Sequence, residues 1–290
     1  MPAVPAAPLP RREPRRALLF TRVAAVAALA ATLAYLVWRA TSTMAWSVWW
    51  LSVPLLGLEV HAALSLALFI HETWDVESAL AVAPVAGPPG RVAVLVPTYN
   101  EPLEVLLPTI AAAVALVPAH ETWVLDDGDR PEVEALARAL GADYLTRPTH
   151  EHAKAGNLNH ALGVVDADFV AVLDADHVAL PGFLTHTLGY FADPRVAVVQ
   201  TPQDFYNVES FEHEHRRGAL RRSHLPRFSE QGLFYRVILA GKNRWGAAFW
   251  CGTNAVVRTV ALREVGGVAA DTVTEDIHTT IRLHRRGWRN

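Results

Sequence analysis

The sequence predicts an α/β protein: a mostly parallel sheet with helices on both faces, preceded by a hairpin of two transmembrane helices. Three observations predict this class. Strand-like apolar runs alternate with helix-like segments from residue 91 onward, which is typical of a parallel sheet covered by helices. Two apolar stretches near the amino end have the length of about 20 residues that crosses a bilayer. Polar and acidic residues follow several of the strand-like runs, at the edge where such sheets bind ligands.

Length and composition narrow the class of protein. A chain of 290 residues that is 51% apolar can form one large domain or two small ones. Nine tryptophans, a positive mean hydropathy and a net charge of only -3 do not describe a nucleic-acid binder, so we expect no nucleic acid as a partner. Cys251 is the single cysteine, which rules out an internal disulfide and fits a reducing compartment.

The apolar stretches at 17–38 and 46–70 predict the two membrane-spanning helices. Four arginines precede the first span, whereas the loop at 39–45 carries one basic residue. By the positive-inside rule, the tail 1–16 and the chain after the hairpin at 17–71 face the cytoplasm. We therefore expect a multi-pass protein of the inner (plasma) membrane. A cleaved signal peptide is the weaker alternative, because a second span follows the first at once.

Two ionisable residues, Glu59 and His61, fall inside the second predicted span. Charged groups inside a membrane are costly and are often functional. A polar contact between neighbouring helices is the simpler interpretation, and we favour it.

Residues 72–90 form a linker that ends in APVAGPPG, and the soluble domain occupies 91–290. We expect its elements in this order: a strand at 92–96, a helix at 103–116, a strand at 122–125, a helix at 131–140, a short strand at 144–145, a helix at 153–164, a strand at 169–173, a helix at 181–191 and a strand at 196–199.

Carboxylates at the ends of neighbouring strands predict a cation and a polar ligand, because clustered like charges repel each other. Asp126 and Asp127 follow one strand, and Asp174 and Asp176 follow another. Side chains alternate along a strand, so Asp174 and Asp176 can share one hard cation such as Mg²⁺, together with a diphosphate. The simpler alternative for this Asp-x-Asp is a solvated turn after a strand.

Lys154 stands at the expected start of a helix, where the positive end of the helix dipole favours a phosphate. A lysine on its own is more often a solvated surface residue, and this alternative stays open. No glycine-rich loop of the dinucleotide or P-loop type follows any of the strands. A dinucleotide-dependent oxidoreductase and an ATPase are therefore disfavoured.

Several motifs occur in the order found in processive family 2 glycosyltransferases, and the chain resembles the catalytic subunits of bacterial cellulose synthases. The motifs are VPTYNEP at 96–102, LDDG at 125–128, HAKAGN at 152–157, DADH at 174–177, QTPQDFYN at 200–207, FWCGTNAVVR at 249–258, EVGG at 264–267 and TVTEDIHTTIRLHRRGW at 272–288. The resemblance implies a GT-A-like fold, a UDP-sugar donor, a polysaccharide acceptor and Mg²⁺ or Mn²⁺ as cofactor. It also leaves room for further membrane or periplasmic subunits.

The resemblance also implies roles for single residues. Asp276 matches the general base that deprotonates the acceptor hydroxyl, and Asp174 and Asp176 match the metal-diphosphate motif. The nucleotide-sugar site is matched by Tyr99, Glu101, Asp126, Asp127, Lys154 and Asp174, and the acceptor site by Cys251, Gly252 and Glu275.

The implied reaction suits these residue types. An acceptor hydroxyl attacks the anomeric carbon in line while a nucleoside diphosphate leaves, so the site needs one base and one charge neutraliser. The alternative for the stretch 274–276 is a helix N-cap, since a threonine followed by acidic residues is a good capping sequence. Both roles are compatible.

Family members carry further on a Gln-x-x-Arg-Trp motif and additional membrane helices, so we expect a glycosyltransferase domain that is incomplete at its carboxyl end. Three rivals remain at this point. The first is a related family 2 synthase of a β-1,3-glucan, a chitin-like or a mannan chain. The second is a phosphatase of the haloacid dehalogenase type, which would need its Asp-x-Asp after the first strand. The third is a non-catalytic membrane protein that keeps the sugar-nucleotide fold as a binding or scaffold module.

Overall fold

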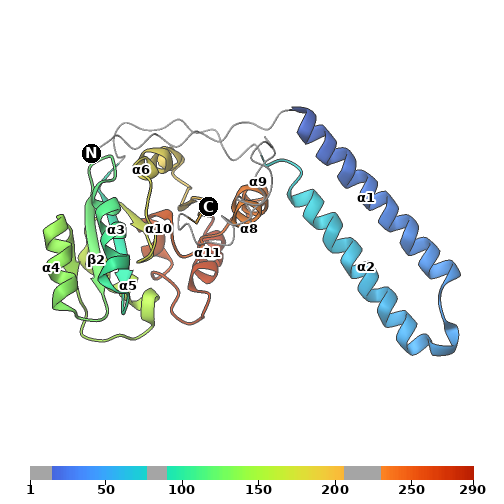
Figure 1. Cartoon of the computed structure of the whole chain (residues 1–290), viewed down its shortest axis with the longest axis horizontal. Coiled ribbons are helices and arrows are strands. Elements are labelled where there is room, and N and C mark those ends of the chain that lie inside the picture. Colours follow the sequence, from blue (N-terminus) through green and yellow to red (C-terminus); the bar gives the residue numbers. More distant parts are fainter. Residues whose placement is uncertain (1–14, 77–89, 206–229) are drawn as a thin grey trace.

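The computed structural model describes residues 15–76, 90–205 and 230–290. Most of the predicted basic tail and of the predicted linker lies outside the described residues. Two long helices form a rod that projects from an α/β domain, and α8 and α9 lie between the two parts (Figure 1).

The rod is a hairpin of α1 (Arg15–Ser42) and α2 (Trp49–Glu72), joined through the short η1 (Trp46–Val48). Both helices are long and apolar enough to cross a membrane, and their most apolar windows are not buried inside the protein. A soluble core helix would be covered by its neighbours, so the exposure of both helices fits a lipid environment. The structure thus has the predicted helical hairpin.

A polar contact joins the two helices of the hairpin. The carboxylate of Glu59 on α2 lies 3.3 Å from Nε of Arg39 and accepts a hydrogen bond of 3.1 Å from the hydroxyl of Tyr35, both on α1. Partners of opposite charge lower the cost of ionisable groups in such a segment. The interpretation of Glu59 as an interhelical contact is therefore confirmed, whereas the side chain of His61 is exposed.

The α/β domain is built on a six-stranded sheet with the order β3-β2-β1-β4-β6-β5. Its strands are β1 (Val92–Thr98), β2 (Glu121–Asp126), β3 (Asp143–Leu145), β4 (Phe169–Val172), β5 (Val198–Gln200) and β6 (Ala255–Arg258). β1 to β4 run parallel, and β6 is antiparallel to both of its neighbours. The mostly parallel sheet is confirmed, and β6 is a strand that the alternation of elements did not predict.

Helices cover both faces of this sheet. On one face, α5 (Ala153–Val164), α10 (Thr259–Glu264) and α11 (Glu275–Arg285) pack against Leu95 and its neighbours. On the other face lie α3 (Leu103–Val114), α4 (Pro131–Leu140), α6 (Phe183–Thr187) and η3 (Leu188–Ala192). Every residue of β1 is buried, because alternate side chains enter two hydrophobic layers.

A second contact region lies where the hairpin meets the domain. The segment α8 (Glu230–Leu233), η4 (Phe234–Leu239, a π-helical stretch) and α9 (Ala240–Arg244) reaches the end of α2. There Lys242 Nζ lies 2.6 Å from the carboxylate of Glu72, and Arg244 lies 3.4 Å from that of Asp75. These ion pairs join the helical hairpin to the domain.

Candidate active site

The loops that follow β1, β2 and β4 lie at one edge of the sheet. Thr98 at the end of β1 pairs with Asp126 at the end of β2, and the parallel β4 ends just before Asp174. Parallel strands deliver their carboxyl ends to the same edge, which is where ligands bind in such sheets. The sequence motifs after these three strands therefore share one side of the domain.

The side chain of Asp126 is fully buried beneath the loop that follows β2. Its carboxylate accepts hydrogen bonds from the main-chain N–H groups of Gly128 (2.9 Å) and Arg130 (2.8 Å) and from the hydroxyl of Tyr144 (3.0 Å). The guanidinium of Arg130 adds a bond of 2.9 Å. Burial, followed by the bond to Asp126, raises the pKa of Tyr144. Asp126 thus fixes the shape of the loop that follows β2.

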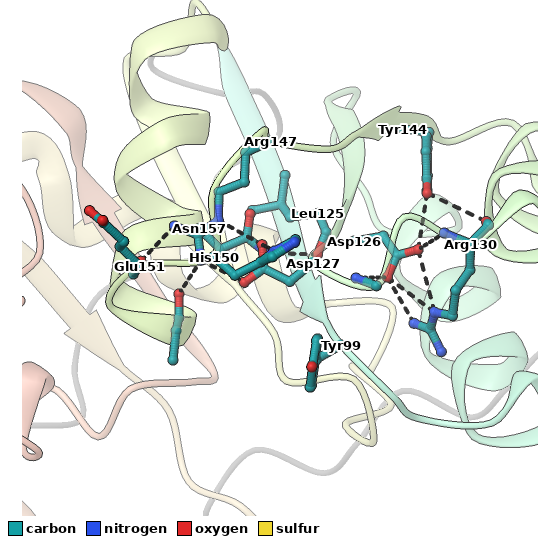
Figure 2. A network of polar contacts seen from close by, with 12 residues as sticks. Tyr99, Leu125, Asp126, Asp127, Arg130, Tyr144, Arg147, His150, Glu151 and Asn157 are labelled. Atoms are coloured by element: carbon teal, nitrogen blue, oxygen red, sulfur yellow. Dashed lines mark hydrogen bonds and ion pairs between the residues drawn. The ribbon is translucent and has the colours of Figure 1, made fainter.

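Asp127 is buried as well, and its partner is Arg147. The guanidinium donates from Nε to Oδ1 at 2.7 Å and from Nη2 to Oδ2 at 2.6 Å. Figure 2 shows the two successive aspartates, each with its own arginine: Asp126 with Arg130 and Asp127 with Arg147. Neither arginine was predicted from the sequence. Arg130 stands four residues after Asp126, and this spacing was the only signal for it.

The loop after β1 is held by Glu101. Its Oε2 accepts hydrogen bonds from the Thr98 hydroxyl (2.6 Å) and from the main-chain N–H of Tyr99 (2.8 Å). Partial burial acts to raise the pKa of Glu101, but these bonds and the nearby Arg130 outweigh it and bring the pKa below its ordinary value. The side chain of Tyr99 is 56% exposed at the same edge. Its ring is free to stack on a flat ligand.

Lys154 links three parts of the site. It stands in the first turn of α5, and its Nζ donates to Oδ1 of Asp174 and, at 2.9 Å, to the carbonyl oxygen of Gly252. The main-chain N–H of Asp174 in turn donates to Oγ1 of Thr253 at 2.9 Å. Lys154 is therefore not a solvated surface lysine, because its ammonium group joins the loop after β4 to the predicted acceptor segment.

Asp174 and Asp176 lie in a turn after β4, so strand alternation does not place them as expected. The side chain of Asp174 is 33% exposed and that of Asp176 is 70% exposed. His177 Nδ1 lies 2.9 Å from Oδ1 of Asp176, a contact that is an ion pair only when the imidazole is protonated. Asp174 and Asp176 therefore form a carboxylate pair that also lies in a solvent-exposed turn, so the two alternatives for this Asp-x-Asp describe the same residues.

These carboxylates fit a hard divalent cation. Exposed carboxylate oxygens are the ligands that Mg²⁺ and Mn²⁺ prefer, and such ions commonly take one or two carboxylates together with phosphates and water. Within the described part of the chain, no three His, Cys, Asp or Glu side chains form a complete metal site. The donor set at Asp174 and Asp176 therefore suits a cation that is shared with a phosphorylated ligand.

Asp276 reaches the same place from the far end of the chain. Gly252 has a φ of 76°, and a Cβ on it would lie 3.3 Å from Oδ2 of Asp276 and 3.6 Å from Nζ of Lys154. The helix α11 begins at Glu275, with Thr274 in the N-cap position but without a side-chain cap bond. The stretch thus starts a helix, as one alternative predicted, and also brings Asp276 beside Gly252 and Lys154.

The acceptor segment is supported by Gln200 at the end of β5. Its side-chain oxygen accepts a hydrogen bond of 2.8 Å from the N–H of Cys251, and its nitrogen donates to the carbonyl of Thr253 at 2.9 Å. Burial, together with the negative charge of the neighbouring Asp276, raises the pKa of the Cys251 thiol to about 11, although a hydrogen bond with Tyr235 acts to lower it. Such a thiol stays protonated near neutral pH, in keeping with a packed residue rather than a nucleophile.

Tyr235 on η4 is a neighbour that no sequence signal marked. Burial raises the pKa of its hydroxyl, and the nearby Cys251, Asp174 and Asp276 add to this effect. The ring packs with Phe249 and Cys251 in a small apolar cluster. Tyr235 thus lies under the acceptor segment, on the helix that also contacts the hairpin.

Comparisons with known proteins agree with this geometry. The model of the family described as "Glycosyl transferase family 2" matches residues 93–266. Cellulose synthase 1 of Komagataeibacter xylinus is 39% identical over 269 residues, which cover 89% of this chain and 17% of that protein. The cellulose synthase catalytic subunit [UDP-forming] of Pseudomonas fluorescens (strain SBW25) is 37% identical over 293 residues, with coverages of 96% and 38%. The chain thus spans well under half the length of these relatives.

A solved structure shares the fold. The mannosyltransferase PcManGT from Pyrobaculum calidifontis, in complex with GDP-Man and Mn²⁺, aligns with a TM-score of 0.54 and 22% sequence identity, over 79% of this chain and 64% of that one. This likeness supports the expected GT-A-like sheet. Taken with the family match and the cellulose synthase relatives, it leads to one conclusion: the chain belongs to glycosyl transferase family 2.

Proposed function

We propose that the chain is the donor-binding and catalytic part of a membrane-bound inverting glycosyltransferase, which transfers glucose from UDP-glucose to a growing β-glucan (cellulose-like) chain. One observation carries the proposal: Lys154, Asp174 and Asp276, from three distant segments, meet around Gly252. A cation-binding carboxylate, a phosphate-binding ammonium group and a second carboxylate that can act as a base are the parts that such a transfer needs.

The donor side of the site would lie over the loops after β1 and β2. The exposed ring of Tyr99 would stack on a uracil, and the loop that Glu101 holds would line the nucleotide. Asp126 and Asp127 would act from beneath, by fixing the loop on which the nucleotide rests. Lys154 would meet a phosphate, with the amino end of α5 adding a favourable dipole.

Asp174 and Asp176 would hold Mg²⁺ or Mn²⁺ together with the diphosphate. The mannosyltransferase of similar fold was solved with GDP-Man and Mn²⁺, which is in line with this choice. When bound, the cation neutralises the charge that develops on the departing diphosphate. The contribution of this chain is to orient the two carboxylates, which it does for Asp174 through Lys154 and Thr253.

Asp276 would take the proton of the acceptor hydroxyl. As the hydroxyl oxygen bonds to the anomeric carbon, the bond to the diphosphate breaks on the opposite face, and the proton passes to the Asp276 carboxylate. Gly252 carries no side chain where it faces Oδ2 of Asp276, so no Cβ crowds this oxygen at 3.3 Å. The acceptor hydroxyl would approach Asp276 beside Gly252. Glu275, the first residue of α11, and Cys251, which lies near Asp276, would line the path of the acceptor.

The hairpin would hold this domain at the bilayer. We infer a tail at 1–16, membrane helices within 17–71, a linker at 72–90 and a cytoplasmic domain from 91 onward, in a multi-pass protein of the inner membrane. The exposed apolar surface of α1 and α2 supports the lipid contact. The chain would bind the polysaccharide acceptor at the acceptor segment. Further membrane or periplasmic subunits would be additional partners.

The test is donor turnover by the full-length protein in lipid nanodiscs with Mg²⁺ or Mn²⁺. We expect nucleotide release from UDP-glucose to exceed that from UDP-N-acetylglucosamine and GDP-mannose. Asp276→Asn should lower transfer by about 10²–10⁴-fold, the usual contribution of a positioned base, while donor affinity stays within about twofold. Asp271→Asn, which removes an exposed carboxylate just before α11, is the matched control.

Each of three other outcomes would change the proposal in a different way. Preference for another nucleotide sugar would reassign the product to a related polymer, such as a β-1,3-glucan, a chitin-like chain or a mannan. Unchanged transfer by Asp276→Asn would remove Asp276 from the role of base. If no nucleotide sugar bound to the wild-type protein, the domain would be a non-catalytic module.

A further inference from the structure

The buried guanidinium of Arg147 connects two loops of the site. Besides its paired bonds to Asp127, it donates from Nη1 to the carbonyl oxygen of Glu151 at 2.7 Å and from Nη2 to that of Ala153 at 2.9 Å. Arg147 is 9% exposed. A planar guanidinium can bind a carboxylate and two carbonyls at once in fixed geometry, which a lysine cannot do. Figure 2 shows Arg147 above Asp127, between the loop after β2 and the segment that leads into α5.

The segment that Arg147 grips has an unusual backbone. His152 and Ala153 have φ values of 62° and 42°, in the left-handed region that residues with a side chain seldom adopt. Such conformations persist only where surrounding contacts enforce them, and they gather at functional sites. The two carbonyl oxygens that Arg147 binds, those of Glu151 and Ala153, flank this strained pair directly.

The next turn of the chain leaves little room for another arrangement. A Cβ on Gly156 would collide with the carbonyl oxygen of Glu151 and with Nη1 of Arg147. The side chain of Asn157 donates to the carbonyl oxygen of Leu125 at 2.9 Å, so α5 is also tied to β2. The only residue of this turn that reaches outward across the site is Lys154, toward Asp174 and Gly252.

We propose that Arg147 is a positioning residue that aims Lys154 by holding the strained backbone at His152 and Ala153 against Asp127. The inference rests on the proposed function, in which Lys154 binds a donor phosphate. Without the two carbonyl bonds, the pair at 152–153 relaxes to ordinary φ values and the first turn of α5 shifts. Lys154 then no longer reaches Asp174 and Gly252 together, and a displacement of about 1 Å at such a group can cost about 10²-fold in rate.

A double-mutant cycle tests this coupling in the full-length protein in nanodiscs. The variants are Arg147→Gln, Lys154→Met and the two combined, and the readout is affinity for UDP-glucose with Mn²⁺. We expect Arg147→Gln alone to weaken donor affinity about tenfold or more. In the Lys154→Met background the same change should weaken it less than about twofold, because its effect acts through Lys154. Arg138→Gln is the control, since that arginine pairs with Glu134 on the exposed face of α4.

Arg147→Gln removes the guanidinium that pairs with the buried carboxylate of Asp127, so a second variant is needed to separate the proposed role from a loss of folding. The pair Asp127→Asn with Arg147→Gln removes both charges together, so the cycle is repeated with it. Amide hydrogen exchange across residues 151–156, without nucleotide, gives an independent readout. We expect it to speed up in the variants at Arg147 and to stay unchanged in Lys154→Met.

Equal losses of affinity in both backgrounds, or unchanged exchange across 151–156, would overturn the role of Arg147. If the wild-type protein bound no UDP-sugar, the proposed function would fall instead. The exchange comparison would then still decide whether Arg147 holds the segment before Lys154.

Discussion

The ammonium nitrogen of Lys154 and the carbonyl oxygen of Gly252 lie 2.9 Å apart, although 98 positions separate them in the chain. This bond joins the donor side of the site, on α5, to the acceptor segment after α9. Gly252 has a φ of 76°, which favours glycine, and its bare Cα faces both Lys154 and Asp276. A glycine at this point keeps open the space between the proposed base and the proposed phosphate ligand.

Gly252→Ala should therefore lower sugar transfer by about tenfold or more, because the new methyl group would lie 3.3 Å from Oδ2 of Asp276. The measurement is transfer to acceptor at saturating donor. The matched control is Gly246→Ala, since Gly246 has a φ of 63° and a Cβ there meets nothing within 4 Å. Both variants carry the same left-handed strain of about 1–2 kcal/mol. An equal loss of transfer in the two variants would show that strain, and not crowding at Asp276, is responsible.

Asp174→Asn and Asp176→Asn should each raise the Mn²⁺ concentration needed for donor binding by about 10- to 100-fold, because each removes a carboxylate from the proposed cation site. We expect the larger effect at Asp174, since that change also weakens the partner of Lys154. Donor affinity titrated against Mn²⁺ measures this. Asp168→Asn, which alters an exposed carboxylate at the opposite end of β4, should leave the metal dependence unchanged. If donor binding depended on the Mn²⁺ concentration in the same way in all three variants, no cation would bind at this turn.

Local signals in the sequence predicted much of the fold. The helices α4 and α5 have the expected bounds. For α4, Pro131 marks the first helical position and Gly141 follows the last one. Two features escaped for physical reasons. β6 is a short apolar strand whose antiparallel pairing with β4 depends on contacts far apart in the chain. Asp174 and Asp176 were expected to alternate as on a strand, but β4 ends at Val172 and they lie in the turn that follows. The sequence alone defines the last residue of a strand poorly.

The candidate site was predicted as a set of residue types, but their partners were not. Motifs placed Lys154, Asp174 and Asp276, and the structure brings them together. The motifs did not indicate that the side chain of Asp126 is fully buried. The groups that donate hydrogen bonds to its carboxylate, such as Tyr144, come close only in the folded chain. Arg147 was missed for the same reason: its role rests on the carbonyls it binds, and carbonyls carry no signature in a sequence.

Alkylation of Cys251 should be slow near neutral pH and should speed up about tenfold per pH unit toward pH 10, because the pKa of this buried thiol is raised to about 11. Asp276→Asn should lower this pKa and make the thiol react faster at any given pH, since a neighbouring negative charge disfavours the thiolate. The rate of iodoacetamide labelling of the single cysteine measures both effects. Asp271→Asn serves as the control. A rate that levels off near pH 8.5, or that ignores Asp276→Asn, would mean that the thiol is exposed and distant from Asp276.

The contact between the hairpin and the domain leads to a last prediction, in which two helical glycines, one away from this contact and one within it, are compared. Replacing a helical glycine with alanine usually stabilises a protein by up to about 1 kcal/mol, because alanine loses less backbone freedom on folding. Gly163 on α5 has open space around it, so Gly163→Ala should raise the melting temperature.

Gly241 on α9 is different, because a Cβ there would lie 2.6 Å from the carbonyl oxygen of Glu72 at the end of α2. Gly241→Ala should therefore lower the melting temperature of the protein in nanodiscs, since main-chain atoms of the hairpin must move and the neighbouring pair of Lys242 and Glu72 is loosened. If Gly241→Ala stabilised the protein as Gly163→Ala does, α9 would not be seated on the hairpin in the membrane. A destabilisation confined to Gly241 would instead support a direct contact between the hairpin and the helical segment that carries Tyr235 beneath the acceptor segment.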